Sequence, residues 1–166
     1  MTYSWREGAH LRPTRVLYDE EDGAVHEKRY AYNDHGLITW KTEHPSTGGW
    51  FPTFYNRDAR GRLESTDYPD GTSESWTRDE FGNPLTHTLR NGATESWTYH
   101  DGVTGPLGLK KSHLGPAKVG EVGTTQSWTY YDNGLIEEHT LATGGKVRYE
   151  YNEIGQMTKE LSLIHI

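Results

Sequence analysis

Histidine and carboxylate side chains are the groups in this sequence that could supply metal ligands or acid–base chemistry. The chain has 166 residues, including 9 His and 24 Asp and Glu. A zinc site of the His-x-x-x-His type needs two histidines at that short spacing, and no two histidines here show it. We therefore expect no metal ligand, and we expect the histidines to be solvated or in turns. They are His10, His26, His35, His44, His87, His100, His113, His139 and His165.

Motifs for catalysis and cofactor binding are not found in the sequence. A catalytic carboxylate pair must lie across a cleft, and no spacing here indicates such a pair. The glycine-rich segment from Gly102 to Gly108 lacks the Lys-Ser/Thr ending of a phosphate-binding loop. There is no nucleophile elbow, and without Cys there is no thiolate centre. The sequence thus predicts no catalytic residue and no cofactor.

Three tryptophans form the remaining candidate site, because an indole ring could stack on a sugar. Trp76, Trp97 and Trp128 each follow a serine and precede a threonine. Recurrence of this kind is what cross-strand packing requires, and an aromatic pair there stabilises a sheet by roughly 0.2–1 kcal/mol. A single binding site does not require recurrence. We therefore favour packing and keep carbohydrate stacking on these rings as the alternative.

Two of the tryptophans lie in a stretch, residues 64–101, that nearly repeats itself. Gly71 and Gly92 are 21 residues apart, and so are Trp76 and Trp97. Self-similarity at a fixed period indicates a repeat architecture. Asp70-Gly71 and Asn91-Gly92 are dipeptides that favour a type I′ hairpin turn, in which both central residues have positive φ. Each unit is thus predicted to be a β-hairpin.

A second turn connects one predicted hairpin to the next. In most copies Asn or Asp stands three residues before Gly, a pattern that suits a type I turn. Asn133-Gly134 departs from the pattern and is interpreted as a tighter turn. An apolar residue follows two residues after Gly61 but three after Gly82. The pattern therefore does not determine which face of the sheet the tryptophans occupy. The regular pairs are Asn33 with Gly36, Asp58 with Gly61, Asp79 with Gly82, and Asn152 with Gly155.

The repeat unit also divides the chain. A segment with six Gly and Lys110-Lys111 interrupts the period and is predicted to be a long loop. After Met157 the pattern predicts a strand and a further glycine turn, which the last residues do not supply. The divisions are 1–29, degenerate repeats; 30–101, regular repeats; 102–123, a loop insertion; 124–160, further repeats; and 161–166, a doubtful tail that is truncated in mid-repeat.

Composition agrees with a β-rich chain of many short strands. There are 6 Trp and 11 Tyr but only 3 Phe, together with 19 Gly and 7 Pro. The net charge of -7 argues against a nucleic-acid partner, because such proteins usually carry a basic surface. The first eight residues lack the apolar core of a signal peptide. No run of about 18 apolar residues indicates a membrane span.

The turn pattern resembles that of the rearrangement-hotspot (RHS) or YD-repeat family. The resemblance covers about residues 30–160, apart from the insertion. It rests on Tyr32-Asn33 with Gly36, on Asp58 to Leu63, on Asp79 with Gly82 to Leu85, and on Tyr151-Asn152 with Gly155. It implies an all-β fold of consecutive antiparallel hairpins, forming a curved, spiralling sheet that is a segment of a hollow shell. The self-cleavage motif of some members, Asp-Pro followed by Gly-Leu, is not found.

The function implied by the resemblance is a structural one. In bacterial members the shell encloses a toxic C-terminal domain, and in teneurins a related shell acts in adhesion. We therefore expect a non-enzymatic segment of a large secreted or cell-surface bacterial protein, whose partner is the rest of the same polypeptide with an enclosed effector domain. A carbohydrate-binding adhesive module, with glycans as partners, and an enzyme with its site in residues 102–123 are the alternatives.

Overall fold

The computed structural model describes residues 2–5, 12–19, 25–44 and 48–163, and His10 and His165 lie outside these ranges. The described residues form fourteen β-strands and no helix. Their contacts group them into two units, residues 1–75 and residues 76–166. No helix that is long and apolar enough to cross a membrane occurs in the described part of the chain.

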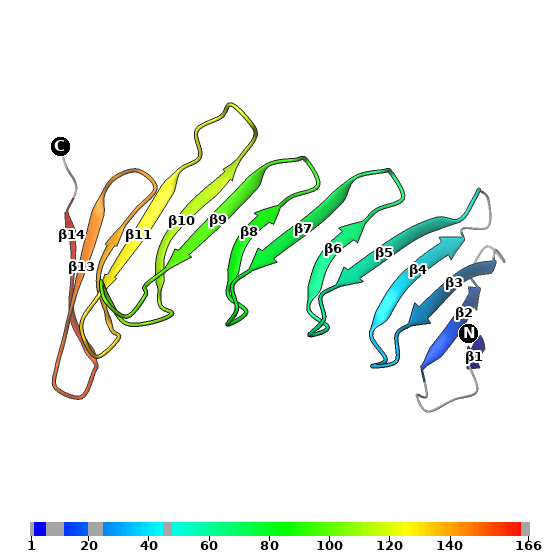
Figure 1. Ribbon diagram of the computed structural model, residues 1–166, viewed down its shortest axis with the longest axis horizontal. Coiled ribbons are helices and arrows are strands. Elements are labelled where there is room, and N and C mark those ends of the chain that lie inside the picture. Colours follow the sequence, from blue (N-terminus) through cyan, green and yellow to red (C-terminus); the bar gives the residue numbers. More distant parts are fainter. Residues whose placement is uncertain (1, 6–11, 20–24, 45–47, 164–166) are drawn as a thin grey trace. The chain divides into compact units, whose positions relative to one another are not determined.

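In the first unit every strand lies beside its neighbours in the chain and runs antiparallel to them (Figure 1). This order is the one expected when each strand is followed by a hairpin turn. The strands are β1 (Thr2–Trp5), β2 (Pro13–Asp19), β3 (Val25–Tyr32), β4 (Ile38–His44), β5 (Phe51–Arg57), β6 (Leu63–Asp67) and the first half of β7 (Ser73–Arg78).

The second unit continues in the same manner, again as antiparallel neighbours in chain order. Its strands are the second half of β7, β8 (Pro84–Thr88), β9 (Thr94–Tyr99), β10 (Lys110–Ala117), β11 (Thr125–Tyr130), β12 (Ile136–Thr140), β13 (Lys146–Tyr151) and β14 (Met157–Leu163). Leu161 and Leu163, which were expected to belong to the doubtful tail, therefore lie in a strand. Residues 164–166 are outside the described ranges.

Neither unit has an interior of large apolar side chains. Among the described residues only Ala93 and Val147 are buried apolar side chains, with 6% and 8% of their surface exposed. Most domains bury a core between two packed layers. Here the strands form one layer, so stability has to come from the backbone ladder and from side-chain pairs across neighbouring strands.

One loop geometry recurs throughout the described residues. In eight hairpins three residues lie between a closing pair, as between Tyr68 and Thr72. The Tyr68 N–H donates to the Thr72 carbonyl (2.9 Å), and the Gly71 N–H donates to the Tyr68 carbonyl (3.1 Å). Gly71 has a φ of 80°. This is a type I turn followed by a left-handed residue that forms a bulge. The eight glycines are Gly36, Gly61, Gly71, Gly82, Gly92, Gly134, Gly144 and Gly155.

Two predictions about turn type are wrong. A type I′ turn needs positive φ at Asp70 and Asn91, whereas no described residue other than glycine has positive φ. Asn133-Gly134 does not close a tighter turn either, because its loop has the same two closing hydrogen bonds, between Tyr131 and Leu135 and between Gly134 and Tyr131. An Asn-Gly or Asp-Gly dipeptide suits both loop types, since either one places Gly at a left-handed position.

The acidic and amide side chains of these loops accept hydrogen bonds from the loop backbone in two ways. Asp58 is the first residue of its loop, and its Oδ1 accepts from the N–H of Arg60 and of Arg62, both at 2.9 Å. Asn33, Asp79 and Asn152 occupy the same place. Asp70, Asn91 and Asn133 instead stand directly before glycine, and each accepts from the N–H two residues later. Both arrangements satisfy loop donors that no strand partner reaches.

A bulge recurs in four of the strand pairs, next to the loop that joins their strands. The register shifts between Ala31 and Tyr32, between Asn56 and Arg57, between Thr129 and Tyr130, and between Glu150 and Tyr151. An extra residue in one strand changes which face the following side chains occupy. This is the physical reason why the face of the tryptophans could not be deduced from alternation alone.

The prediction of a single loop over residues 102–123 is wrong for its central part, which forms β10. Gly115 and Pro116 are loop signals in a sequence, but in the structure they lie where the register between β9 and β10 is interrupted. The Thr98 and Ser112 hydroxyls hydrogen-bond at 2.7 Å across this strand pair. Pairing with β9 thus overrides the local sequence signal.

The loop before β10 is an expanded form of the recurrent loop. The His100 N–H donates to the Leu109 carbonyl (2.8 Å), and the Gly108 N–H donates to the His100 carbonyl (2.9 Å). These are the two bonds that close the standard loop, but eight residues lie between the closing pair instead of three. The five additional residues therefore lie outside the backbone hydrogen bonds that pair β9 with β10.

The recurrent loop leads to a first prediction, which compares two open glycines of the first unit. A Cβ added at Gly71 or at Gly49 would meet no atom within 4 Å, but only Gly71 has positive φ. We expect Gly71→Ala to lower the free energy of unfolding by about 1–2 kcal/mol, the strain of a left-handed alanine. Gly49→Ala should not lower it. Urea unfolding followed by tryptophan fluorescence measures both, and equal losses would contradict the assignment.

Candidate functional site

The three candidate tryptophans lie on alternate strands of the second unit, and each is paired with a histidine of the next strand. The ring centroids of Trp76 and His87 are 4.6 Å apart with an interplanar angle of 11°. Trp97 and His113 lie directly opposite each other, with a centroid separation of 5.1 Å and an angle of 6°. Trp128 and His139 also lie directly opposite each other, with a centroid separation of 4.8 Å and an interplanar angle of 11°. We call this set the Trp–His ladder.

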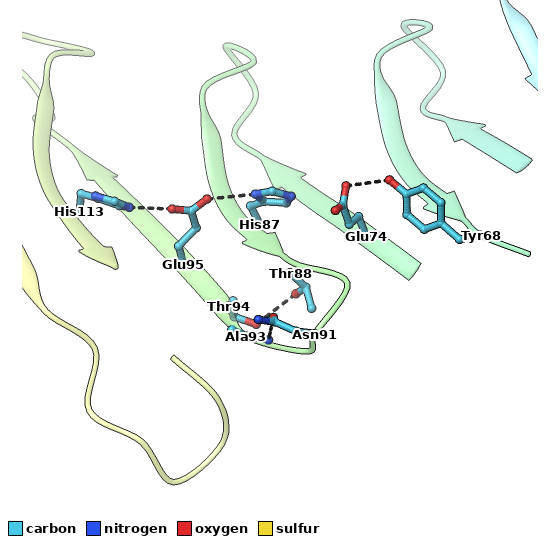
Figure 2. A network of polar contacts seen from close by, with 9 residues as sticks. All are labelled: Tyr68, Glu74, His87, Thr88, Asn91, Ala93, Thr94, Glu95 and His113. Atoms are coloured by element: carbon cyan, nitrogen blue, oxygen red, sulfur yellow. Dashed lines mark hydrogen bonds and ion pairs between the residues drawn. The ribbon is translucent and has the colours of Figure 1, made fainter. Parts of the chain in front are cut away.

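A carboxylate links two of the histidines (Figure 2). His87 Nδ1 donates to Glu95 Oε1 and His113 Nε2 donates to Glu95 Oε2, both at 3.0 Å. Glu95 lies on β9 between the two histidine strands and directly opposite His87. All three side chains are largely buried. The carboxylate therefore joins three neighbouring strands through side chains as well as through the backbone.

Electrostatics keep this carboxylate ionised. Burial raises the pKa of Glu95, but the hydrogen bonds and charges of His87 and His113 outweigh that effect, so the pKa lies below its ordinary value of 4.5. An opposite charge or a donor beside a carboxylate favours the charged form. Glu95 is thus an anion that accepts two hydrogen bonds at neutral pH.

The next Trp–His pair, Trp128 with His139, has a neutral amide in the place that Glu95 occupies beside Trp97. Gln126 stands two residues before Trp128, as Glu95 stands two residues before Trp97. Gln126 Oε1 accepts from His139 Nε2 at 3.1 Å. Burial lowers the pKa of His139, and no carboxylate is hydrogen-bonded to it there to oppose that effect. His139 is therefore held neutral by its surroundings.

Hydroxyl groups occupy the other face of the same strands. The hydroxyls of Thr77 and Thr86 hydrogen-bond at 2.6 Å, and those of Thr88 and Thr94 at 3.2 Å. Together with the bond between Thr98 and Ser112, these pairs cross four strands, β7 to β10. Because successive residues of a strand point to opposite faces, the second unit has one aromatic and imidazole face and one hydroxyl face.

The histidine prediction is wrong for several residues. His87, His113 and His139 are neither solvated nor in turns, and His100 is buried at 6% exposure. A signal was present in the spacing, since His follows Trp by 11 residues at Trp76 and at Trp128 and by 16 at Trp97. The difference of five is the expansion of the His100–Leu109 loop, which could not be recognised before β10 was known.

A separate aromatic contact in the first unit was not predicted either. The guanidinium carbon of Arg29 lies 4.2 Å from the ring centroid of Trp50, and the His44 ring lies 4.7 Å from it. Also in this unit, the Tyr68 hydroxyl donates to Glu74 Oε2 at 3.1 Å (Figure 2). Trp50 stands outside the Ser-Trp-Thr pattern, and nothing in its neighbourhood in the sequence marks it.

The contacts of the Trp–His ladder are those of side-chain packing. A histidine covers one face of each ladder tryptophan, and the Lys110 ammonium lies 5.4 Å from the ring centroid of Trp128. These contacts support the packing interpretation, while carbohydrate stacking on Trp76, Trp97 and Trp128 stays a prediction. Within the described ranges, no three His, Asp or Glu side chains converge as metal ligands would.

Comparison with known proteins gives a family model and a set of solved structures. Residues 57–94 match the model of the RHS Repeat. No curated protein sequence matches the chain. A crystal structure of TcdB2-TccC3-Cdc42 is similar with a TM-score of 0.55 at 14% identity, over 94% of this chain and 9% of that chain. The structure of the Photorhabdus luminescens Tc holotoxin pore, with a mutated TccC3, is similar with a TM-score of 0.55 at 15% identity, over 94% of this chain and 9% of that chain.

These comparisons confirm the RHS resemblance and the all-β fold of consecutive antiparallel hairpins. TcdB2-TccC3 without its hypervariable C-terminal region is also similar, with a TM-score of 0.55 at 12% identity, over 89% of this chain and 10% of that chain. At such identities the similarity is one of fold. The chain spans about a tenth of the length of the structures that it matches.

The linking carboxylate yields a second prediction. We expect Glu95→Gln to lower the free energy of unfolding at pH 7 by about 1–2 kcal/mol, because hydrogen bonds to a charged group are lost. Since the folded-state pKa is lowered, the native advantage is fully present above pH 4.5 and is lost as the pH falls through the folded value. The free energies of unfolding of the parent chain and of Glu95→Gln, measured by urea unfolding from pH 7 to pH 3, should therefore converge as the pH falls. A constant difference over that range would contradict the assignment.

The hydrogen bond between Gln126 and His139 leads to a third prediction, in which a substitution places a carboxylate beside this histidine. We expect Gln126→Glu to raise the pKa of His139, because an adjacent anion favours the imidazolium form. Proton NMR titration of the imidazole signals measures the shift. His87 and His113, which already contact Glu95, serve as internal controls and should move less. An unchanged His139 titration would contradict the hydrogen bond between these two side chains.

Proposed function

Because the chain carries an RHS repeat and folds like part of the Tc toxin structures, we propose that it is a non-enzymatic stretch of wall. In this proposal it belongs to a large secreted or cell-surface bacterial protein. Its hairpins form part of a shell that encloses or presents a C-terminal effector domain. The further repeats and the effector of the same polypeptide are its partners.

The single-layer construction is the observation that carries this proposal. Only two apolar side chains are buried among the described residues, while Phe81, Val103 and Ile154 are largely exposed. A sheet of this kind gains little from a core of its own, and its strands depend on the strands beside them. Such a sheet is suited to be a wall, whose stability increases with every hairpin added to it.

The edge of the sheet at β14 supports the same proposal. In the second unit β14 pairs with β13 through six residue pairs. Six of the seven residues from Met157 to Leu163 are exposed, and only Leu161 is partly buried. An unpaired strand edge presents backbone donors and acceptors to any strand that can reach it. A further hairpin of the polypeptide would extend the ladder there.

A fourth prediction tests the wall in the full-length polypeptide. Ser96 lies in β9 between β8 and β10, so Ser96→Pro removes a backbone donor from a central strand. Val119 is the second residue of a turn in which the Glu121 N–H donates to the Lys118 carbonyl, a position that favours proline. We expect the effector to be digested by protease several-fold faster in Ser96→Pro than in Val119→Pro.

The comparison requires that both variants keep their strands, which circular dichroism establishes. Size-exclusion chromatography then shows whether each variant retains the compact size of the unmodified protein. If the effector were equally protected in both variants, or equally accessible in the unmodified protein, the enclosing role would be ruled out.

A further inference from the structure

A groove in the second unit lies between a standard loop and the expanded loop. Its volume is about 400 Å³, within the range of sites that hold small ligands or a few side chains. The standard loop, residues 79–83, contributes Phe81, and the expanded loop contributes Leu107. Leu85 and Trp97 line the groove between them, and Asp79 and Asp101 line it as well.

The apolar side chains of this groove are unusually exposed. Phe81 is 73% and Leu107 is 67% exposed, and Leu85 is also exposed. Single exposed apolar residues are normal, but several that gather around one hollow mark an interaction surface. Neighbouring backbone leaves these side chains uncovered, so a partner would bury them.

The expanded loop is held in place by a buried histidine. The His100 ring meets the Tyr130 ring edge-on, with centroids 5.6 Å apart, and its Nε2 lies 3.3 Å from the Trp128 carbonyl oxygen. Gly105 packs so closely on this ring that a Cβ there would collide with it. The loop is thus anchored at its base. A surface that is already ordered loses less entropy when it binds a partner.

Two carboxylates give the groove its charge. The backbone N–H groups of Thr104 and Val103 donate to Asp101 and hold its pKa at about 2. Burial raises the pKa of Asp79, but hydrogen bonds from Asn83 and from the loop backbone outweigh this and lower it. Lys110, which lies opposite Tyr99, directs its ammonium toward the Trp128 ring. The groove is therefore apolar along its walls and anionic beside them.

We propose that this groove binds an extended peptide segment in which large apolar side chains are flanked by lysine or arginine. The apolar side chains would fill the space between Phe81, Leu107 and Trp97. The basic groups would pair with Asp79 and Asp101, since complementary charge steers a partner into register. The inference goes beyond the wall function and does not depend on it, because it uses only contacts within the second unit.

Fluorescence anisotropy with the 166-residue chain tests the proposal. The probe is a labelled hexapeptide with two central leucines and two lysines on either side, and the matched peptide has glutamate in place of lysine. We expect only the lysine peptide to bind, with affinity that falls as salt rises. Phe81→Ser and Leu107→Ser should each weaken it at least about fivefold. Val119→Ser, at a fully exposed residue of another loop, should leave it unchanged.

A charge variant separates the two contributions. Asp101→Asn keeps an oxygen acceptor for the loop backbone but removes the charge, so it should weaken binding and reduce the salt dependence. Circular dichroism of each variant establishes that its strands are kept. Equal affinity for the two peptides, no binding of the lysine peptide, or no loss in Phe81→Ser and Leu107→Ser would overturn the proposal. So would self-association of the chain that Leu107→Ser abolishes, because a second copy would then be the occupant.

Discussion

Backbone pairing between consecutive strands is the interaction on which the rest of this molecule depends. A single-layer sheet has two solvent-accessible faces, so apolar burial cannot select one register over another as it does in a sandwich. The register is set instead at the ends of the strands, where the same two hydrogen bonds close each recurrent loop. A glycine at positive φ makes those bonds compatible, which is why glycine recurs there and the other loop residues vary.

The Trp–His ladder adds side-chain selectivity to that backbone register. A one-residue slip would carry each tryptophan to the hydroxyl face and separate it from its histidine. Glu95 strengthens the same choice, because its carboxylate reaches histidines on both neighbouring strands only in the observed register. The stacking and the bridging carboxylate thus perform, on the surface of a sheet, the specifying role that a packed core performs elsewhere.

Local chemistry made the hairpins predictable, and pairing between strands made the rest unpredictable. The glycines of the turns and their Asn or Asp partners lie close together in the sequence, so the all-β hairpin order could be deduced. The turn type could not, because Asn91-Gly92 fits two loops that differ in length and in the φ of Asn91. Strand β10 was missed because Gly115 and Pro116 suggest a loop, and pairing with β9 and β11 overrides that signal. The candidate tryptophans were found, whereas their histidines were not, since 11 and 16 residues do not look like one spacing.

The position of the five extra residues explains how the chain can vary without losing its ladder. Had they been inserted within a strand, every later side chain would have been displaced relative to its partner, and an odd number would have exchanged the two faces. Between His100 and Leu109 they leave the closing bonds intact, so His113 still faces Trp97. A loop between two strands is therefore the place where a regular sheet can acquire a local feature. The buried His100 fixes the shape of that feature, and Leu107 adds an exposed apolar side chain to it.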